Sequence, residues 1–479
     1  MKIAMIASEA IPFAKTGGLA DVLGTLSTAL EPLGHHITLI LPAYRCTLRS
    51  DFPLRQLPFK LSVALADRTE DATVLQTVIG KRIDVYLIRA DRYFDREFLY
   101  GTAVEDYPDN AERFTFFNRA ALEILRAYPV DVVHAHDWQA ALAIVFLKTQ
   151  GARYPEIAAA KTLLTIHNLG FQGLFEQSKW QLLNLDDGLF TPQYLEFYGR
   201  INFLKGGLVF ADKLTTVSPA YAQEIMTPEQ GFGLEDVVRQ RADDLIGILN
   251  GVDYNQWNPW ADPYLTPHHG VNNRSVKRNS KTHLRQMLDL PDRSATPVIA
   301  MISRLTSQKG FDLVTTIFDR LMQREVQFAL LGSGEPQFEE FFRTAATRYP
   351  GRVTVRIGFD ERLAHRIEAG ADLFLMPSLY EPCGLNQMYS LKYGTIPIVR
   401  AVGGLRDTVE DYDPATESGT GFVFEAYDAQ ALLDAIDRGL AAFHDKPAWS
   451  ALRRRAMAMD FSWDRSAQAY SNLYQQLLS

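Results

Sequence analysis

Lys15 and the two glycines that follow it form the first stretch with residue types suited to chemistry. Gly17 and Gly18 stand between an apolar run at 2–7 and a helical pattern that continues beyond Asp21. Glycine lets the backbone approach a ligand, and the first turn of a helix presents unpaired N–H groups and a positive dipole end. The pattern predicts an anion site, with phosphate as the expected anion. A tight turn beside a solvated lysine is the structural alternative.

Arg304 and Lys309 form a second cationic stretch. They lie five residues apart, after an apolar run at 298–302, and Gly310 precedes the next helical pattern. A guanidinium, an ammonium and a helix N-terminus together suit a diphosphate. The alternative is a pair of solvated surface cations. Their position at the carboxyl end of an expected strand favours a function.

Glu381 begins a third stretch, Glu-Pro-Cys-Gly-Leu, which follows the apolar run at 373–376. A glutamate at a strand end can accept hydrogen bonds from sugar hydroxyls, and the amides of Gly384 and Leu385 can meet a phosphate oxygen. Alternatively, Glu381 caps the helix that follows. Cys383 stands at a helix start, which can lower a thiol pKa, but no base is adjacent to it. We therefore interpret Cys383 as a packing or ligand-contact residue.

Polar residues also follow two apolar runs in the first half. His134 and His136 alternate along one run, so their imidazoles point to one side. Asp137 ends that run, and His167 and Asn168 end the next. The sequence has no second ligand cluster with metal-site spacing, so we expect no metal. These residues are better interpreted as polar groups that face a ligand.

Apolar runs alternate with helical patterns through both halves, which predicts an α/β fold of doubly wound parallel sheets. The expected strands are 2–7, 37–41, 82–89, 130–136, 162–166, 213–217, 245–249, 298–302, 327–331, 353–357, 373–376 and 396–399. Ligands of such sheets bind beyond the carboxyl ends of the strands, where Glu9 also lies.

The strand–helix alternation lapses from 255 to 294, where prolines and Gly270 indicate a poorly structured connection. We therefore predict Rossmann-like domains at 1–254 and 255–460, which face a cleft, and a final helical segment at 461–479. The five residues from Gly17 to Asp21 recur in form from Gly403 to Asp407, which supports two related halves.

Bulk properties exclude several classes of protein. The chain has 479 residues, a formal net charge of −8, and two cysteines, Cys46 and Cys383. The negative charge argues against a nucleic-acid partner, and two cysteines form no disulfide framework. No apolar stretch approaches the roughly 18 residues of a membrane helix, and the N-terminus lacks a signal peptide. We expect a soluble cytoplasmic protein without a membrane or nucleic-acid partner.

Seven motifs, in order along the chain, resemble those of the bacterial glycogen synthase and plant starch synthase family. They are Lys15–Leu19, Asp109–Phe114, His134–Trp138, Thr165–Asn168, Asn250–Asp253, Arg304 with Lys309, and Glu381–Leu385. The resemblance covers essentially the whole chain. It implies a GT-B glycosyltransferase that moves glucose from ADP-glucose to the non-reducing end of an α-1,4-glucan with retention, without a cofactor or metal.

The resemblance also implies a role for each site residue. Lys15, Gly17 and Gly18 would meet the nucleotide diphosphate, and Arg304 and Lys309 would stabilise the leaving ADP. Glu381 would hold the donor glucose, which Cys383, Gly384 and Leu385 would approach together with the phosphate. His167 and Asn168 would line the glucose site, Asp137 would lie near the reacting centre, and Glu9 and Trp138 would lie towards the acceptor. The 255–460 domain would bind the donor, and the helix at 461–479 would return to the first domain.

Other functions stay open at this point. A glycosyltransferase with another donor or acceptor is one alternative, with UDP-glucose the first such donor, because recognition of the nucleotide base leaves no clear pattern in a sequence. A non-catalytic glucan-binding protein is disfavoured because binding alone would not need Lys15, Arg304, Lys309 and Glu381 together. A dehydrogenase is disfavoured because the first turn lacks Gly-x-Gly-x-x-Gly, and a P-loop nucleotidase because Lys15 precedes its glycines. No nucleophile is identified, and Tyr389 stands where the wider superfamily often has a second glutamate.

Overall fold

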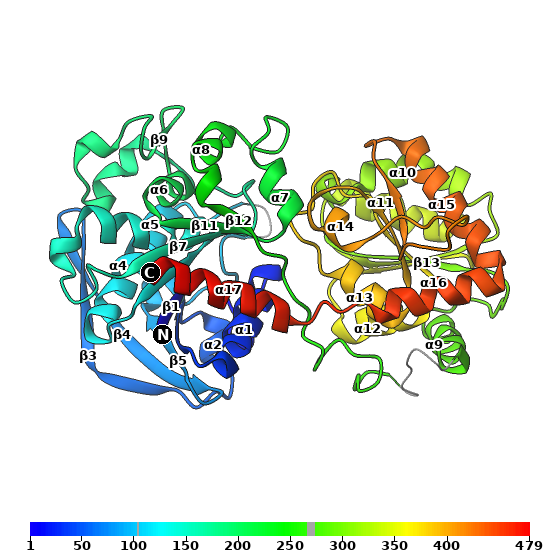
Figure 1. Cartoon of the computed structure of the whole chain (residues 1–479), viewed down its shortest axis with the longest axis horizontal. Helices are drawn as coiled ribbons and strands as arrows, with labels where there is room; N and C mark the ends of the chain where they lie inside the picture. Colours follow the sequence, from blue (N-terminus) through cyan, green and yellow to red (C-terminus); the bar gives the residue numbers. More distant parts are fainter. Residues whose placement is uncertain (103–104, 266–273) are drawn as a thin grey trace. The chain divides into compact units, whose positions relative to one another are not determined.

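The computed structural model describes residues 1–102, 105–265 and 274–479, which form two compact units (Figure 1). The N-terminal unit comprises Met1–Val217, Ala222–Gly251 and Trp463–Ser479, and the C-terminal unit comprises Ser218–Tyr221 and Val252–Ser462. After the short excursion at 218–221, the chain therefore changes unit at 251/252 and at 462/463. The sequence predicted these changes at 254/255 and 460/461.

A nine-stranded sheet forms the centre of the N-terminal unit, in the order β12-β11-β7-β6-β1-β2-β5-β4-β3. Its parallel strands are β1 (Lys2–Ile6), β2 (His36–Pro42), β5 (Ile83–Arg89), β6 (Val132–His136), β7 (Lys161–Ile166), β11 (Lys213–Thr216) and β12 (Leu245–Gly247). These strands confirm the α/β class predicted from the apolar runs. The strand order reverses between β1 and β6, and such a switch point is where open α/β sheets bind ligands.

Two strands of this sheet were missing from the prediction. β3 (Arg55–Leu65) and β4 (Arg68–Ile79) pair antiparallel with each other, and β4 pairs antiparallel with β5. The sheet is therefore mixed, not wholly parallel as expected. The side chains of β3 alternate between buried and exposed, so β3 lacks the continuous apolar run of a strand buried on both faces. A small antiparallel sheet adds β8 (Leu174–Glu176), β9 (Glu196–Phe197) and β10 (Arg200–Asn202).

Helices cover the sheet of the N-terminal unit. They are α1 (Gly18–Leu30), α2 (Arg45–Leu48), α3 (Asp91–Phe94), α4 (Asn110–Ala127), α5 (Asp137–Thr149), α6 (Phe203–Phe210), α8 (Glu235–Gln240) and α17 (Trp463–Leu478). The C-terminal helix α17, red in Figure 1, lies beside α1. Its Tyr470, Leu473 and Tyr474 are buried in the same core as Leu23 and Leu26 of α1. The last helix of the chain is thus part of the N-terminal core.

The C-terminal unit contains a wholly parallel six-stranded sheet, in the order β15-β14-β13-β16-β17-β18. Its strands are β13 (Val298–Ile302), β14 (Gln327–Gly332), β15 (Val353–Ile357), β16 (Leu373–Met376), β17 (Ile396–Arg400) and β18 (Phe422–Phe424). The order reverses between β13 and β16, which again defines a switch point.

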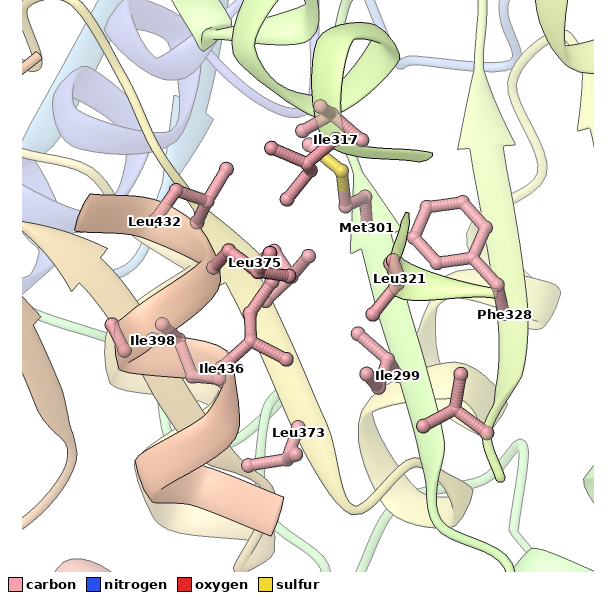
Figure 2. Packing of buried hydrophobic residues seen from close by; sticks show 14 of the residues in the cluster. Ile299, Met301, Ile317, Leu321, Phe328, Leu373, Leu375, Ile398, Leu432 and Ile436 are labelled. Atoms are coloured by element: carbon pink, nitrogen blue, oxygen red, sulfur yellow. The ribbon is translucent and has the colours of Figure 1, made fainter. Parts of the chain in front are cut away.

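Helices also pack on the sheet of the C-terminal unit. Those of this unit are α9 (Arg274–Met287), α10 (Phe311–Leu321), α11 (Pro336–Arg348), α12 (Glu361–Gly370), α13 (Asn386–Tyr393), α14 (Gly403–Thr408), α15 (Ala429–His444) and α16 (Lys446–Ala458). Helix α7 (Pro219–Glu224) is divided between the two units, with the boundary after Tyr221. Figure 2 shows Leu432 and Ile436 of α15 packed with Leu375 and Ile398 of the sheet. Burying each such side chain contributes about 1.5–3 kcal/mol, which gives the strand ends a rigid base.

Helix α9 corrects the prediction that 255–294 is a poorly structured connection. The sequence did not predict this helix because its many cations hide the apolar face of a packed helix. Two of these cations, Lys277 and Lys281, are nevertheless buried. Lys277 Nζ donates to Thr395 Oγ1 at 2.5 Å, and Lys281 Nζ pairs with Asp372 at 2.6 Å. Part of the predicted connection, 266–273, lies outside the described residues. No helix among the described residues is long and apolar enough to cross a membrane.

Candidate active site

Lys309 and Glu381 form an ion pair at the switch point of the C-terminal unit. Lys309 ends a short 3-10 helix after β13, and Glu381 lies in the loop after β16. Lys309 Nζ lies 2.8 Å from Glu381 Oε1 and 2.6 Å from Oε2, and Ser378 Oγ donates to Oε2 at 3.0 Å. The side chain of Glu381 is 7% exposed and that of Lys309 is 19% exposed. The predicted diphosphate-binding cation and the predicted sugar-binding carboxylate therefore meet.

Three glycines allow the backbone packing that produces this pair. Gly310 adopts a φ of +76°, and a Cβ there would lie 2.1 Å from the carbonyl oxygen of Pro377. Residues 381–385, here called the donor loop, pack equally closely on the start of α14. A Cβ on Gly403 would lie 2.0 Å from Glu381 O, and one on Gly404 would lie 2.0 Å from Cys383 O. A larger residue at any of these positions would displace the loop.

The other predicted donor-side residues lie near this pair in different environments. Arg304 is exposed, with Nη2 3.5 Å from Gln308 Oε1. Cys383 is buried, as expected for a packing residue. Gly384 adopts a φ of +70°, and Leu385 is the residue before the first turn of α13. Because α13 has no side-chain cap and Glu381 binds Lys309, the capping role considered for Glu381 is wrong.

Glu9 occupies the switch point of the N-terminal unit, after β1. Its carboxylate accepts hydrogen bonds from Thr16 N–H at 2.5 Å, Thr16 Oγ1 at 2.9 Å, Gly17 N–H at 3.3 Å and Tyr100 Oη at 2.7 Å. Burial raises the pKa of Glu9, and these hydrogen bonds partly oppose that rise. The Gly17 amide, predicted to meet a phosphate, is directed at Glu9 in this structure. Glu9 therefore fixes the backbone of Thr16 and Gly17.

Asp137 opens α5 and organises the neighbouring strand end. Its Oδ1 accepts hydrogen bonds from the backbone N–H groups of His167 at 2.7 Å and Asn168 at 3.4 Å. Asp137 has a φ of +55°, a region that non-glycine residues rarely adopt outside functional sites. Burial raises the pKa of Asp137 to about 7, and the charge of nearby Glu9 adds to that rise. The structure thus brings Glu9, Asp137, His167 and Asn168 together.

Three histidines form an array beside Asp137. His136 Nδ1 and His167 Nε2 lie 3.0 Å apart, and the rings of His134 and His136 have centroids 4.0 Å apart, on one side of the strand as predicted. His134 Nδ1 lies 2.8 Å from Tyr474 Oη of α17. Burial lowers the pKa of all three imidazoles, that of His167 to about 3. The array is therefore neutral near pH 7.

Two predicted residues are engaged elsewhere. Lys15 Nζ pairs with Asp21 Oδ1 at 2.7 Å, and its side chain is 43% exposed. The Trp138 ring, expected towards the acceptor, is buried against Phe114 and Phe175 at centroid distances of 4.9 and 5.8 Å. A Cβ on Gly173 would lie 2.5 Å from that ring. The Trp138 ring is therefore packed in the core of the N-terminal unit, and its place towards the acceptor stays a prediction.

Three residues of the site were missed by the sequence analysis. Tyr100 supports Glu9, Ser378 supports Glu381, and Tyr474 supports His134. Their partners are distant in sequence except for Ser378, which follows a strand and was recognisable from that position. Within residues 1–102, 105–265 and 274–479, no three His, Cys, Asp or Glu side chains are grouped to hold a metal ion.

Comparisons with known proteins agree with this geometry. The family described as starch synthase catalytic domain matches residues 2–240, and the family described as glycosyl transferases group 1 matches residues 286–447. The fold and the site thus define a glycosyltransferase of the GT-B class.

Relatives along the full length identify the family. A glycogen synthase of Anaeromyxobacter sp. (strain Fw109-5) is 49% identical over 100% of this chain and 99% of its own length, and one of Koribacter versatilis is 46% identical over 99% and 98%. The catalytic domain of starch synthase IV from Arabidopsis thaliana, solved bound to ADP and acarbose, superposes with a TM-score of 0.92 at 34% identity, covering 99% of each chain. The chain belongs to the glycogen synthase and starch synthase family.

Proposed function

We propose that the protein transfers glucose from ADP-glucose to the non-reducing end of an α-1,4-glucan with retention of configuration. The observation that carries the proposal is the Lys309–Glu381 pair at the switch point of the C-terminal sheet. Full-length similarity to glycogen synthases supports the reaction, and the ADP in the related starch synthase structure supports the donor.

The pair suits the departure of a nucleoside diphosphate. A lysine ammonium has three N–H donors, and Glu381 accepts two of them. The third remains for a phosphate oxygen, while the two contacts fix the direction of the Nζ group. Arg304, on the loop that leads to Lys309, supplies a second cation. Both would stabilise the negative charge that develops on ADP as the bond between glucose and phosphate breaks.

Glu381 would also orient the donor glucose. Each carboxylate oxygen can accept more than one hydrogen bond, so Glu381 can hold Lys309 and still accept from sugar hydroxyls. The donor loop continues into α13, whose N-terminal dipole favours an anion beside Gly384 and Leu385.

The N-terminal unit would bind the reacting glucose and its acceptor. Two backbone amides orient Asp137, which we place near the reacting centre, where its carboxylate form would stabilise positive charge on the sugar. Neutral His167 can exchange a hydrogen bond with a sugar hydroxyl without adding a competing positive charge. Lys15 would leave Asp21 to reach the diphosphate.

A coupled ADP- or UDP-release assay tests the proposal. Initial rates are measured with ADP-glucose and with UDP-glucose, each with and without glycogen. We expect release from ADP-glucose that depends on glycogen. Faster release from UDP-glucose would overturn the donor, and glycogen binding without release from either donor would indicate a non-catalytic glucan-binding protein.

A further inference from the structure

Three exposed aromatic residues of the N-terminal unit have no role in the site described above. Phe171 is 52% exposed, Tyr198 is 83% exposed and Phe232 is 39% exposed. Large apolar side chains exposed close together on a surface often indicate a binding site. We refer to these three residues as the aromatic surface.

The backbone at two of these positions is held in an unfavourable conformation. Tyr198 has a φ of +50° and Phe232 a φ of +51°, and each is followed by a glycine that also has positive φ, Gly199 and Gly233. Tyr198 and Gly199 form the two-residue turn between β9 and β10, where asparagine or glycine would be favoured at the first position. A bulky residue in this region is an outlier, and such outliers concentrate at functional sites.

The loops that carry the three aromatic residues are tied to one another. A Cβ on Gly233 would lie 2.9 Å from Phe197 Cζ and 3.7 Å from Tyr198 Cε2, so the loop of Phe232 packs on the β9–β10 turn. Gln172, next to Phe171, donates from Nε2 to Phe232 O at 3.0 Å. The aromatic surface is therefore one fixed arrangement on three loops.

The aromatic surface continues directly from the proposed glucose site. Phe171 N–H donates to Asn168 O at 3.1 Å, so the two residues belong to one turn. The Asn168 amide in turn donates to Asp137. A chain that places its terminal glucose beside His167 and Asn168 would find Phe171 first along this surface.

We propose that the aromatic surface binds internal glucose units of the α-1,4-glucan acceptor. This rests on the proposed function, because the acceptor chemistry comes from it. A glucopyranose ring presents C–H groups on its faces, which pack on an aromatic ring while the hydroxyls stay in water. Single rings on separate loop tips suit successive sugar units of a flexible chain. The surface thus increases affinity for long chains over short ones.

Affinity electrophoresis in gels with and without glycogen tests this inference without requiring turnover. Tyr198→Gly combined with Phe232→Gly removes two rings and relieves both positive-φ positions, so the protein should stay folded. Tyr198→Asn is a second variant, since asparagine tolerates this conformation. Trp260→Ala, which removes another exposed aromatic side chain (55% exposed), is the matched control.

We expect the double glycine variant to weaken glycogen binding at least fivefold, with Tyr198→Asn weakening it in the same direction and Trp260→Ala behaving as wild type. In kinetics, KM should rise more for glycogen than for maltotriose. Unchanged retardation in both Tyr198 variants would overturn the inference. A change in oligomeric state on size exclusion without glucan would also overturn it, because the surface would then be a protein contact. Absence of ADP release in the wild type would refute the proposed function but leave the binding result interpretable.

Discussion

Replacing Asp137 with asparagine should make the protein more stable at high pH. Burial raises the pKa of Asp137 from 3.8 to about 7, so the folded state favours the protonated carboxyl. This preference stabilises the folded state fully below pH 3.8. The stabilisation is lost as pH rises to about 7, because the Asp137 carboxyl loses its proton at lower pH in the unfolded chain than in the folded one. Asparagine resembles the neutral carboxyl, keeps an oxygen for the two amides, and has no charge to bury.

The size of the effect follows from the pKa shift. Between pH 5 and pH 8 the wild type loses the free energy of about two pKa units, or about 3 kcal/mol at 1.36 kcal/mol per unit. Asp137 is 8% exposed, so solvent screens this charge weakly. For a structural unit of the size of the N-terminal unit, a change of about 3 kcal/mol in stability corresponds to a change of roughly 6–10 °C in Tm. The variant should gain that much over wild type on going from pH 5 to pH 8 while losing glucosyl transfer.

Thermal unfolding of both proteins at pH 5, 6, 7 and 8 checks this. Asp186→Asn is the control, because Asp186 also accepts a backbone hydrogen bond, from Gly188 N–H at 2.8 Å, but is exposed. The Tm difference between Asp137→Asn and wild type should widen with pH, and that of the control should stay constant. A Tm difference that is the same at pH 5 and pH 8 would contradict a raised pKa for Asp137.

Three further substitutions test other parts of the structure. Lys309→Ala should lower turnover at least tenfold and cost about 1–3 kcal/mol in urea unfolding, because the buried carboxylate it pairs with loses its cation; near-normal turnover would refute its role. Gly404→Ala should reduce activity at least tenfold by displacing the donor loop, whereas Gly151→Ala, whose new Cβ would lie 3.8 Å from its nearest neighbour, should be tolerated in both activity and Tm. Tyr474→Phe should cost about 1–2 kcal/mol in urea unfolding by leaving the buried imidazole of His134 without this partner, and an unchanged midpoint would contradict the hydrogen bond.

The parallel strands were predictable because they are buried on both faces. Runs such as Val298–Ile302 are continuously apolar and end at polar residues, which locates both the strand and the candidate site. β3 resisted prediction because its buried residues alternate with exposed ones and Pro58 interrupts it. Helix α9 was not predicted because a lysine such as Lys277 is expected to be solvated. Its burial depends on a hydrogen bond to Thr395, which is 118 residues away in the sequence.

The candidate site was predictable in its residue types more than in its contacts. Lys309 and Glu381 were both recognised, and their strands are neighbours at the switch point, but the direct pair also depends on how Gly310 packs on Pro377. The hydrogen bond from Gly17 N–H to Glu9 was not predicted, because it depends on the path of the chain between the two residues.

The position and configuration of the newly formed glycosidic bond are the most direct test of the proposed glucosyl transfer. The protein is incubated with ADP-glucose and maltoheptaose, and the product is analysed by proton NMR and by digestion from the non-reducing end. We expect maltooctaose, whose added glucose is α-1,4-linked at the non-reducing end. A β-linked product, addition at another position, or no transfer from ADP-glucose would contradict it.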